Sequence, residues 1–551
     1  SHGELSYEVL PGLELKTSLG YTDLQTGEYT DAPTAAIDPT LRSFVPSSAD
    51  FANYDYQTWI VEPQASYKVK LGGGKLSALV GGTIEQNTSQ GQVLQATGFT
   101  SDQLLGNIQA ASSIVVNAVT NTQYKYGAIF GRLGYSWMDK YLLDLTARRD
   151  GSSRFGPGKQ YANFGAAGGA RIFSREEFVQ KALPFLSFGK LRASYGTSGN
   201  DQIPDYGFMS LYSSTINPFL GSQGIYPYNL ANPDYAWEIN KKLEGGIELG
   251  LFKDRILAGA SFYRNRSSSQ LVGYPLSTVT GFTSVQANLA AVVQNTGWEF
   301  SVTTKNIAGK DFSWTSNINL TIPRNKLLSF PGLASSSYAG SYVIGQPLTI
   351  FKAAHSLGAD SATGSYVFSD VKGNPTFNPT FPDDYTVLVD LAPKFYGGFE
   401  NSFRYKGFQL DFLFQFVKQT GAIFISNELP GVEGIQQPVA VLKRWQKPGD
   451  KTNIQKFNED YSLDQAWYDY AENSDGGYGD ASYIRLKNLS FSYTLPSSWE
   501  HKLHLQNCRV YVQGQNLLTI THYAGMDPEN PSVVPSLPPL KVITAGIQLG
   551  L

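Results

Sequence analysis

The stretch Arg149-Asp-Gly-Ser-Ser-Arg-Phe-Gly156 joins two segments that are rich in strand-forming residues, and its place in a repeating pattern indicates the fold. We expect strands at Lys140–Ala147 before it and at Tyr161–Phe173 after it. The same unit recurs along the chain: a strand of roughly ten residues or more, a short turn, a second strand and a long loop. A transmembrane β-barrel produces this alternation, because one of its rims faces the periplasm and the other faces the outside.

Composition supports an all-β membrane protein. The 551 residues include 55 glycines and 13% aromatic residues, but only 16% charged residues, a mixture that suits strands, turns and aromatic girdles. The sequence contains no apolar run long enough for a transmembrane helix. The net charge of -3 comes from cations and anions mixed along the chain, so we expect no nucleic-acid partner. The start, Ser1-His-Gly-Glu-Leu5, does not resemble a signal peptide, which predicts that an N-terminal part is missing from this chain.

Strict alternation of side chains predicts which face of each strand meets lipid. Between residues 408 and 416, the side chains of Phe408, Leu410, Phe412, Phe414 and Phe416 share one face, and Gln409, Asp411 and Gln415 lie on the other. The last strand, Lys541–Leu551, alternates in the same way. In a barrel the phenylalanines face lipid and the polar residues face the lumen.

If the last strand ends in the periplasm, every link is assigned to one rim. The short periplasmic links are Leu10–Pro11, Leu71–Gly74, Met138–Asp139, Ser174–Phe185, Phe252–Asp254, Asn306–Lys310, Lys406–Gly407 and Pro496–Gln506. The outer links are Thr22–Tyr56, Asn87–Thr122, Asp150–Gln160, Gly199–Ala236, Ser268–Val292, Ile322–Pro393, Lys418–Ala481 and Thr519–Leu540. This makes roughly seventeen strands, an odd number, whereas single-chain bacterial barrels have even numbers. We therefore expect further strands before residue 1.

Several short motifs, in this order, resemble those of SusC/RagA-type TonB-dependent transporters of Bacteroidetes. They are Ala147-Arg-Arg-Asp-Gly-Ser-Ser-Arg-Phe-Gly156, Gly189-Lys-Leu-Arg-Ala-Ser-Tyr-Gly-Thr-Ser-Gly-Asn200, Asn232-Pro-Asp-Tyr-Ala-Trp-Glu238, Asn295-Thr-Gly-Trp-Glu299, Trp445-Gln-Lys-Pro-Gly-Asp450, Ala481-Ser-Tyr-Ile-Arg-Leu-Lys-Asn488, Tyr511-Val-Gln-Gly-Gln-Asn-Leu-Leu518 and Tyr523-Ala-Gly-Met-Asp-Pro-Glu529.

The resemblance implies an importer in the outer membrane that makes and breaks no covalent bond and needs no cofactor or metal. Residues 1–551 would be the C-terminal portion of a barrel of about twenty-two strands, without the plug and the first strands. The family implies a SusD-like surface lipoprotein as lid, TonB acting through the missing N-terminal part, a homodimer, and a large nutrient, an oligosaccharide or else a peptide. In such a barrel the lumen surrounds the plug, so Gln409, Asp411 and Gln415 are predicted to contact the plug rather than the nutrient.

Two groups of aromatic residues in outer links are candidates for ligand binding. One is Trp467, Tyr468, Asp469 and Tyr470 with Tyr478, and the other includes Tyr206 and Tyr212. Aromatic faces stack on sugar rings and carboxylates accept hydrogen bonds from hydroxyls. The alternative is that these side chains pack the long loops or contact the lid, since long loops need small cores of their own.

Two other functions fit the sequence less well. A complete passive porin would show steady open pores in a planar bilayer, but the odd strand number disfavours it. An extracellular adhesin or glycan-binding β protein would be soluble without detergent.

Overall fold

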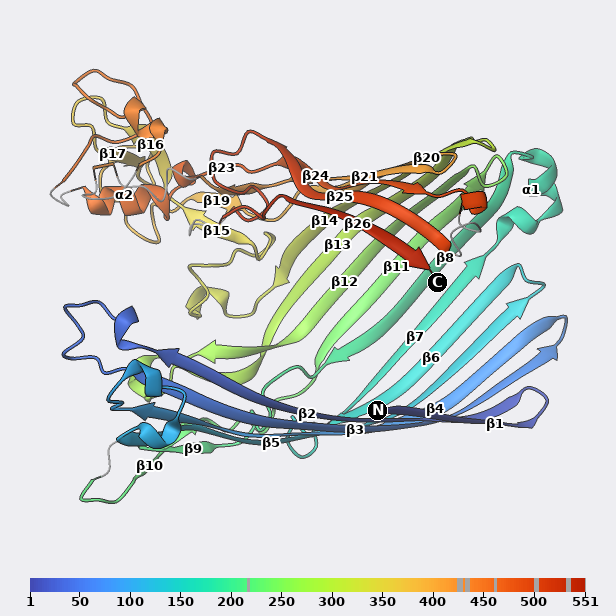
Figure 1. Ribbon diagram of the computed structural model, residues 1–551, viewed down its shortest axis with the longest axis horizontal. Coiled ribbons are helices and arrows are strands. Elements are labelled where there is room, and N and C mark those ends of the chain that lie inside the picture. The colour runs from blue at the N-terminus through green and yellow to red at the C-terminus, as the bar shows by residue number, and fades with distance from the viewer. Residues whose placement is uncertain are drawn as a thin grey trace. The chain divides into compact units, whose positions relative to one another are not determined.

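The computed structural model describes residues 1–215, 219–423, 430–431, 437–459, 463–499, 505–531 and 537–550. Its main sheet contains seventeen strands, which confirms the predicted number. They are β1 (His2–Leu10), β2 (Leu13–Ala32), β3 (Ser48–Leu71), β4 (Gly74–Thr97), β5 (Ser113–Trp137), β6 (Tyr141–Ser152), β7 (Tyr161–Arg171), β8 (Leu186–Asn200), β11 (Glu238–Leu251), β12 (Ile256–Pro275), β13 (Ser284–Ala308), β14 (Phe312–Ser329), β20 (Phe395–Tyr405), β21 (Phe408–Lys418), β24 (Tyr483–Thr494), β25 (Gln506–Thr521) and β26 (Val542–Gly550) (Figure 1).

Shorter elements occupy the links. The outer links contain β9 (Leu211–Ser214), β10 (Ile225–Asn229), β15 (Ile350–Ala353), β16 (His355–Ala359), β17 (Tyr366–Ser369), β18 (Pro375–Thr376), β19 (Val387–Asp390), β22 (Thr420–Ala422), β23 (Tyr478–Asp480) and α2 (Asp464–Ala471), and a periplasmic link contains α1 (Glu177–Ala182). Parts of the predicted links 199–236, 418–481, 496–506 and 519–540 lie outside the described residues. No helix in the described parts of the chain is both long and apolar enough to cross a bilayer.

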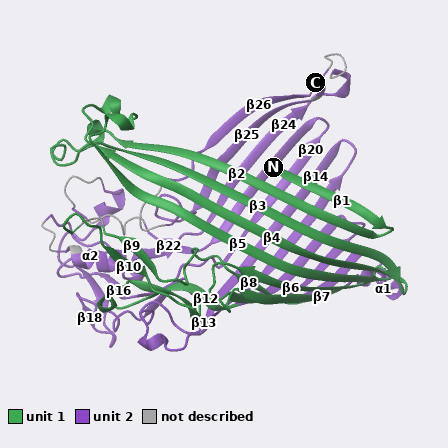
Figure 2. Cartoon of the chain, turned by 90° about the horizontal axis from the view of Figure 1, so that it is seen from below, with its two compact units in different colours: residues 1–170, 194–242, 267–290 green, residues 171–193, 243–266, 291–551 purple. Residues whose placement is uncertain are grey.

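The chain forms two compact units, coloured separately in Figure 2. Unit 1 comprises residues 1–170, 194–242 and 267–290, and unit 2 comprises residues 171–193, 243–266 and 291–551. In unit 1, consecutive strands from β1 to β6 pair in antiparallel fashion. In unit 2, antiparallel pairing runs from β14 through β20, β21, β24 and β25 to β26. The first strand pair of unit 1 is β1 with β2, and the last strand pair of unit 2 is β25 with β26.

The strand register in unit 2 confirms the predicted alternation of polar and apolar faces. Residues that are directly opposite in neighbouring strands lie on the same face of a sheet. On one face the opposed residues are Tyr405, Phe408 and Tyr493, then Phe403, Leu410 and Phe491. On the other face they are Arg404, Gln409 and Ser492, then Ser402, Asp411 and Ser490. One face is therefore aromatic and suited to lipid, and the other is polar.

Strands β2 to β5 of unit 1 are longer than the sequence predicted. They contain 20, 24, 24 and 25 residues, whereas a strand needs about 9–11 to cross a bilayer. The predicted loops 22–56 and 87–122 were wrong in their extent, since the connections between strands cover only residues 33–47 and 98–112. The strands continue because ladder hydrogen bonds form beyond the lipid as well as within it, while polar side chains on both faces remain hydrated.

Candidate functional site: the anchored outer loops

A buried aromatic cluster attaches an outer link to the wall in unit 1. It consists of Phe155, Phe164, Ile203, Tyr235 and Trp237 and is called here the Phe155 cluster. The ring of Phe155 is fully buried, with its centroid 5.3 Å from that of Trp237 and 6.0 Å from that of Tyr235. The indole N–H of Trp237 also donates to the carbonyl of Gln160 over 2.9 Å. The motif that ends in Phe155 therefore holds the segment that carries Ile203, Tyr235 and Trp237.

Arg154 adds a polar attachment next to this cluster. Its Nε lies 2.9 Å from a carboxylate oxygen of Asp205, and its guanidinium carbon lies 4.2 Å from the centre of the Tyr124 ring. The hydroxyl of Tyr124 donates to the carboxylate of Asp201 over 2.8 Å. Arg154 is thus held by a carboxylate and an aromatic face together, an arrangement that suits the planar guanidinium, which can stack on a ring while its N–H groups bind a carboxylate.

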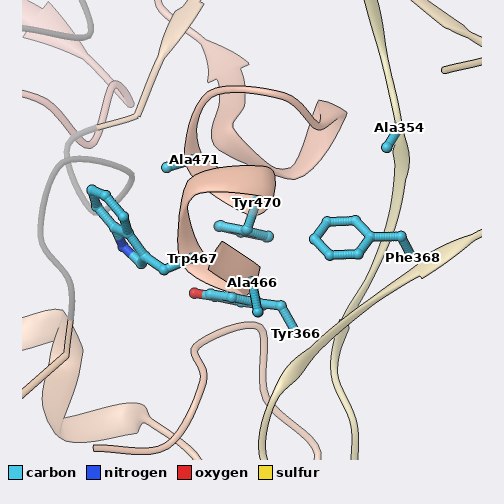
Figure 3. Packing of buried hydrophobic residues seen from close by; sticks show 7 residues of the cluster. All are labelled: Ala354, Tyr366, Phe368, Ala466, Trp467, Tyr470 and Ala471. Atoms are coloured by element: carbon cyan, nitrogen blue, oxygen red, sulfur yellow. The ribbon is translucent and has the colours of Figure 1, made fainter. Parts of the chain in front are cut away.

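The long outer links of unit 2 have a hydrophobic core of their own. This loop core consists of Ala354, Tyr366, Phe368, Ala466, Trp467, Tyr470 and Ala471 (Figure 3). The rings of Tyr366 and Tyr470 stack with 3.9 Å between their centroids and 2° between their planes. Segments about a hundred residues apart in sequence are therefore packed into one small folded structure.

The structure places the predicted ligand-binding residues of this link in two kinds of environment. Trp467 and Tyr470 are buried in the loop core, and Asp469 is buried, accepting hydrogen bonds from the amides of Gln465 and Asn473. For these three residues the structure favours the packing role that the sequence also allowed. By contrast, Tyr468 is 48% exposed. The ring of Tyr478 is partly buried, with its centroid 4.7 Å from that of Phe351.

The predicted residues of unit 1 also differ from each other. The hydroxyl of Tyr206 accepts a hydrogen bond from the backbone N–H of Gln123 over 2.9 Å, so this side chain helps to hold its link. Tyr212 lies on the small strand β9 and is 63% exposed. Tyr468 and Tyr212 are thus the most exposed side chains among the predicted ligand-binding residues, and ligand binding by them stays a prediction.

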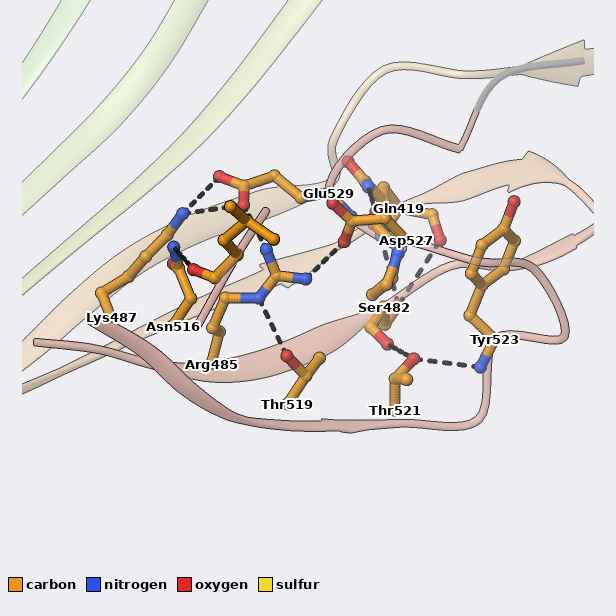
Figure 4. A network of polar contacts seen from close by, with 12 residues as sticks. Gln419, Ser482, Arg485, Lys487, Asn516, Thr519, Thr521, Tyr523, Asp527 and Glu529 are labelled. Carbon is orange, nitrogen blue, oxygen red and sulfur yellow. Dashed lines mark hydrogen bonds and ion pairs between the residues drawn. The ribbon is translucent and has the colours of Figure 1, made fainter. Parts of the chain in front are cut away.

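An ionic network with a buried Arg485–Asp527 pair joins the last outer link to the wall in unit 2. This Arg485 network consists of Arg485, Lys487, Asp527 and Glu529 (Figure 4). Arg485 is only 2% exposed, and its guanidinium is paired with the carboxylate of Asp527 and, over 2.5 Å, with that of Glu529. Lys487 lies 2.7 Å from Glu529. Two cations and two carboxylates make the network neutral, which is what the burial of charge requires.

The polar face of β21 lies beside this network. Gln415 is directly opposite Arg485 in the strand register, and the amide of Gln409 donates to the carboxylate of Asp411 over 2.8 Å. These contacts confirm that Gln409, Asp411 and Gln415 belong to the polar face. Contact between them and a plug stays a prediction.

Two tyrosines and one aspartate in the outer links have pKa values shifted further from neutral pH. Burial raises the pKa of Tyr470 to about 12 and raises that of Tyr366 as well. Hydrogen bonds from Lys418 and then from Ser482 lower the pKa of Asp480 to about 2. In the described parts of the chain, no three His, Cys, Asp or Glu side chains are grouped closely enough to hold a metal ion.

The anchoring residues were missed as functional residues, although they lie in the motifs on which the resemblance rests. Arg154 and Phe155 lie in 147–156, and Tyr235 and Trp237 in 232–238. Likewise, Arg485 and Lys487 lie in 481–488, and Asp527 and Glu529 in 523–529. The available signal was the presence of charged and large aromatic residues in short motifs at the outer ends of strands.

Known proteins are similar to this chain along most of its length. The family model of TonB dependent receptor-like β-barrels matches residues 4–517. TonB-dependent receptor P3 of Formosa agariphila is 29% identical over 555 residues, covering 95% of this chain and 54% of the relative. TonB-dependent receptor SusC of Bacteroides thetaiotaomicron is 25% identical over 589 residues, covering 100% of this chain and 55% of the relative.

The RagAB peptide transporter structure has a chain that is similar throughout. It superposes with a TM-score of 0.86 at 26% identity, covering 100% of this chain and 61% of the other. The present chain spans about half the length of the curated relatives that it matches. The match over residues 4–517, the agreement with SusC and RagAB, and the lipid-compatible strand faces lead to one conclusion: the chain belongs to the TonB-dependent receptor family, of the SusC/RagA type, whose β-barrels lie in the outer membrane.

Proposed function

We propose that residues 1–551 are the C-terminal portion of the barrel of an outer-membrane importer that takes up a large nutrient. The observation that carries this proposal is the anchoring of the outer links by the Phe155 cluster and the Arg485 network. A rim of fixed loops can present the same binding surface repeatedly, as recognition of a large ligand requires.

The complete transporter that we propose contains parts that are not in this chain. A plug and further strands would precede residue 1, TonB would act through that N-terminal part, and a SusD-like lipoprotein would cover the outer links. Two observations support these parts: the chain spans about half the length of its relatives, and its main sheet has seventeen strands, an odd number, whereas single-chain bacterial barrels have even numbers.

The nutrient is proposed to be an oligosaccharide or a peptide. The exposed rings of Tyr468 and Tyr212 suit the stacking that sugar rings favour, and RagAB is named as a peptide transporter. The test is uptake of labelled oligosaccharides and labelled peptides by cells that carry the complete gene, a deletion of it, or the gene with both tyrosines changed to alanine. Compared with cells that carry the complete gene, the deletion strain is expected to lose uptake of either the oligosaccharides or the peptides, but not of both. The proposal would be contradicted if the deletion strain took up oligosaccharides and peptides as well as cells with the complete gene do.

A passive porin is the alternative function, and it differs in its conductance. The complete protein in a planar bilayer is expected to show no steady open current, and its cellular uptake is expected to cease when the proton-motive force is collapsed. Steady pores together with uptake that survives the collapse would favour the porin.

A further inference from the structure

A cavity of about 630 Å³ opens on one face of unit 1, at strands β4 to β6 and the start of β7. Six of its lining residues define its chemistry: Ile84, Lys125, Ile129, Arg149, Gly151 and Tyr161. Its lining contains two cations and no Asp or Glu. None of the functions discussed above uses this cavity.

The strand register shows that this cavity lies on the lipid-facing side of the wall. Ile129 is directly opposite Arg149, so the two side chains share a face. Leu133 is opposite Leu145 on the same face, nearer the periplasm. Tyr126 also lines the cavity, but its side chain lies on the opposite face, where its hydroxyl accepts a hydrogen bond from Arg148 over 2.6 Å and its ring packs against the Phe155 cluster. Lys125 and Arg149 therefore point away from the polar interior.

The cavity lies at the outer boundary of the membrane. The register places Lys125 in one row with Tyr21, Trp59 and Gln86. Tyrosine and tryptophan in such a row are typical of the aromatic girdle at an interface. Trp137, at the periplasmic end of β5, is twelve positions from Lys125 on the same strand. Twelve positions correspond to roughly 40 Å along the strand and, at the usual tilt, to about 30 Å across the membrane. This matches the distance between the two membrane interfaces.

The walls of the cavity combine apolar surface with uncompensated charge. Ile129 is 70% exposed and Ile84 is 55% exposed, so acyl chains can lie against them. The guanidinium carbon of Arg149 lies 5.2 Å from the centre of the Tyr161 ring, and both residues line the cavity. At Gly151 a Cβ atom would come within 2.6 Å of that ring, so a larger residue would move the ring into the cavity.

Lys125 and Arg149 form no ion pair among the described residues, and cations on a lipid-facing wall are costly unless an anion accompanies them. The anion available at this depth is the headgroup of a lipid. Arginine and lysine are the residues that bind phosphate oxygens in proteins. We infer that this cavity binds a phosphate-bearing lipid of the outer leaflet, with its phosphate between Lys125 and Arg149 and its acyl chains along Ile84 and Ile129.

The test measures lipid binding by the complete protein in neutral detergent, with phosphorylated lipid A as the probe and dephosphorylated lipid A as its matched comparison. Native mass spectrometry counts the lipid that each protein retains. The variant Lys125→Gln/Arg149→Gln is expected to weaken binding of phosphorylated lipid A at least about tenfold, or ~1.4 kcal/mol. The control Lys68→Gln/Lys70→Gln removes the same charge from the periplasmic end of β3 and is expected to bind like the original protein.

The outcomes separate the possible sources of binding. Equal binding of phosphorylated and dephosphorylated lipid A would overturn the inference, because only the acyl chains would then matter. Competition by millimolar inorganic phosphate would also overturn it, since the site would then recognise a free anion. Heat-modifiable migration on a gel checks that each variant is folded. If the double variant fails this check, Lys125→Gln alone serves as the test, because its position at the interface disturbs the wall least.

Discussion

Replacing Arg485 with methionine is expected to release the last outer link from the wall without unfolding the barrel. Methionine keeps much of the length of the arginine side chain but removes its charge and all its donors. Asp527 is only 4% exposed and would lose its sole ion-pair partner among the described residues, whereas Glu529 would retain Lys487. Asp527 would therefore remain as a buried carboxylate without a counter-charge.

The size of the effect follows from this stranded charge. Removing one member of a buried ion pair costs about 3–5 kcal/mol. If the link can escape this cost by detaching, the detached population rises roughly 100- to 4,000-fold. The control Lys394→Met breaks the pair Lys394–Asp390, in which the lysine is 46% exposed, and such pairs contribute about 0–1 kcal/mol. Less than about a fivefold change is expected for the control.

Hydrogen exchange followed by mass spectrometry measures this detachment directly in the complete protein. The relevant amides are those of Tyr523, which donates to Thr521, and Glu529, which donates to Asp527. Their exchange should accelerate in Arg485→Met, while exchange in β24 and β25 remains slow. The further change Asp527→Asn should recover part of the protection, since asparagine keeps an acceptor for the amide of Glu529 without the charge. Exchange at 522–531 that is unchanged, or that rises equally in the Lys394 control, would refute the reasoning.

Three further predictions concern the outer links. Phe155→Ala removes a fully buried ring and should destabilise its link by about 3–5 kcal/mol, seen as faster proteolysis between residues 200 and 238. Trp467→Ala should speed proteolysis near α2, because it removes a ring from the loop core. Tyr468→Ala should leave proteolysis unchanged but reduce nutrient uptake, because this ring is exposed. If Trp467→Ala reduced uptake without faster proteolysis and Tyr468→Ala did not reduce uptake, the ligand would be assigned to the buried ring. Because the pKa of Asp480 is lowered, its ionised carboxylate should stabilise the link above pH ~4, and this stabilisation should be lost as the pH falls towards 2. The measurement is hydrogen exchange of the Ser482 amide, which donates to Asp480, corrected for intrinsic exchange rates. Asp480→Asn should abolish this pH dependence.

The faces of the strands could be predicted because they depend on local alternation. Phe408 lies on one face of β21, and Gln409 and Asp411 lie on the other, as the period of two requires. The register of β20, β21 and β24 places aromatic residues opposite aromatic or apolar ones and polar residues opposite polar ones. The extent of β2 to β5 could not be predicted in this way, because hydrophobic alternation ends at the lipid boundary whereas the ladder of hydrogen bonds does not. A strand that continues into water has the polar composition of a loop.

The roles of the loop residues could not be predicted, because they depend on partners that are distant in sequence. Trp467 and Tyr468 are adjacent aromatic residues, yet one is buried and the other is half exposed. The difference arises from a core whose other members include Tyr366 and Phe368, about a hundred positions earlier. Arg485 likewise obtains its counter-charges from Asp527 and Glu529, beyond the intervening strand β25. No local pattern specifies such a pairing.

The motifs on which the resemblance rests contain residues that attach the outer links to the wall. Phe155 and Arg485 have buried contacts that leave no surface for a ligand, so their motifs can be shared by transporters of different nutrients. We predict that specificity for the nutrient resides in exposed residues between these anchors, such as Tyr212 and Tyr468. Exchanging such residues between two relatives should transfer preference for a nutrient while proteolytic resistance of the links stays constant. Transfer of preference by exchange of the anchoring motifs alone would contradict this division of roles.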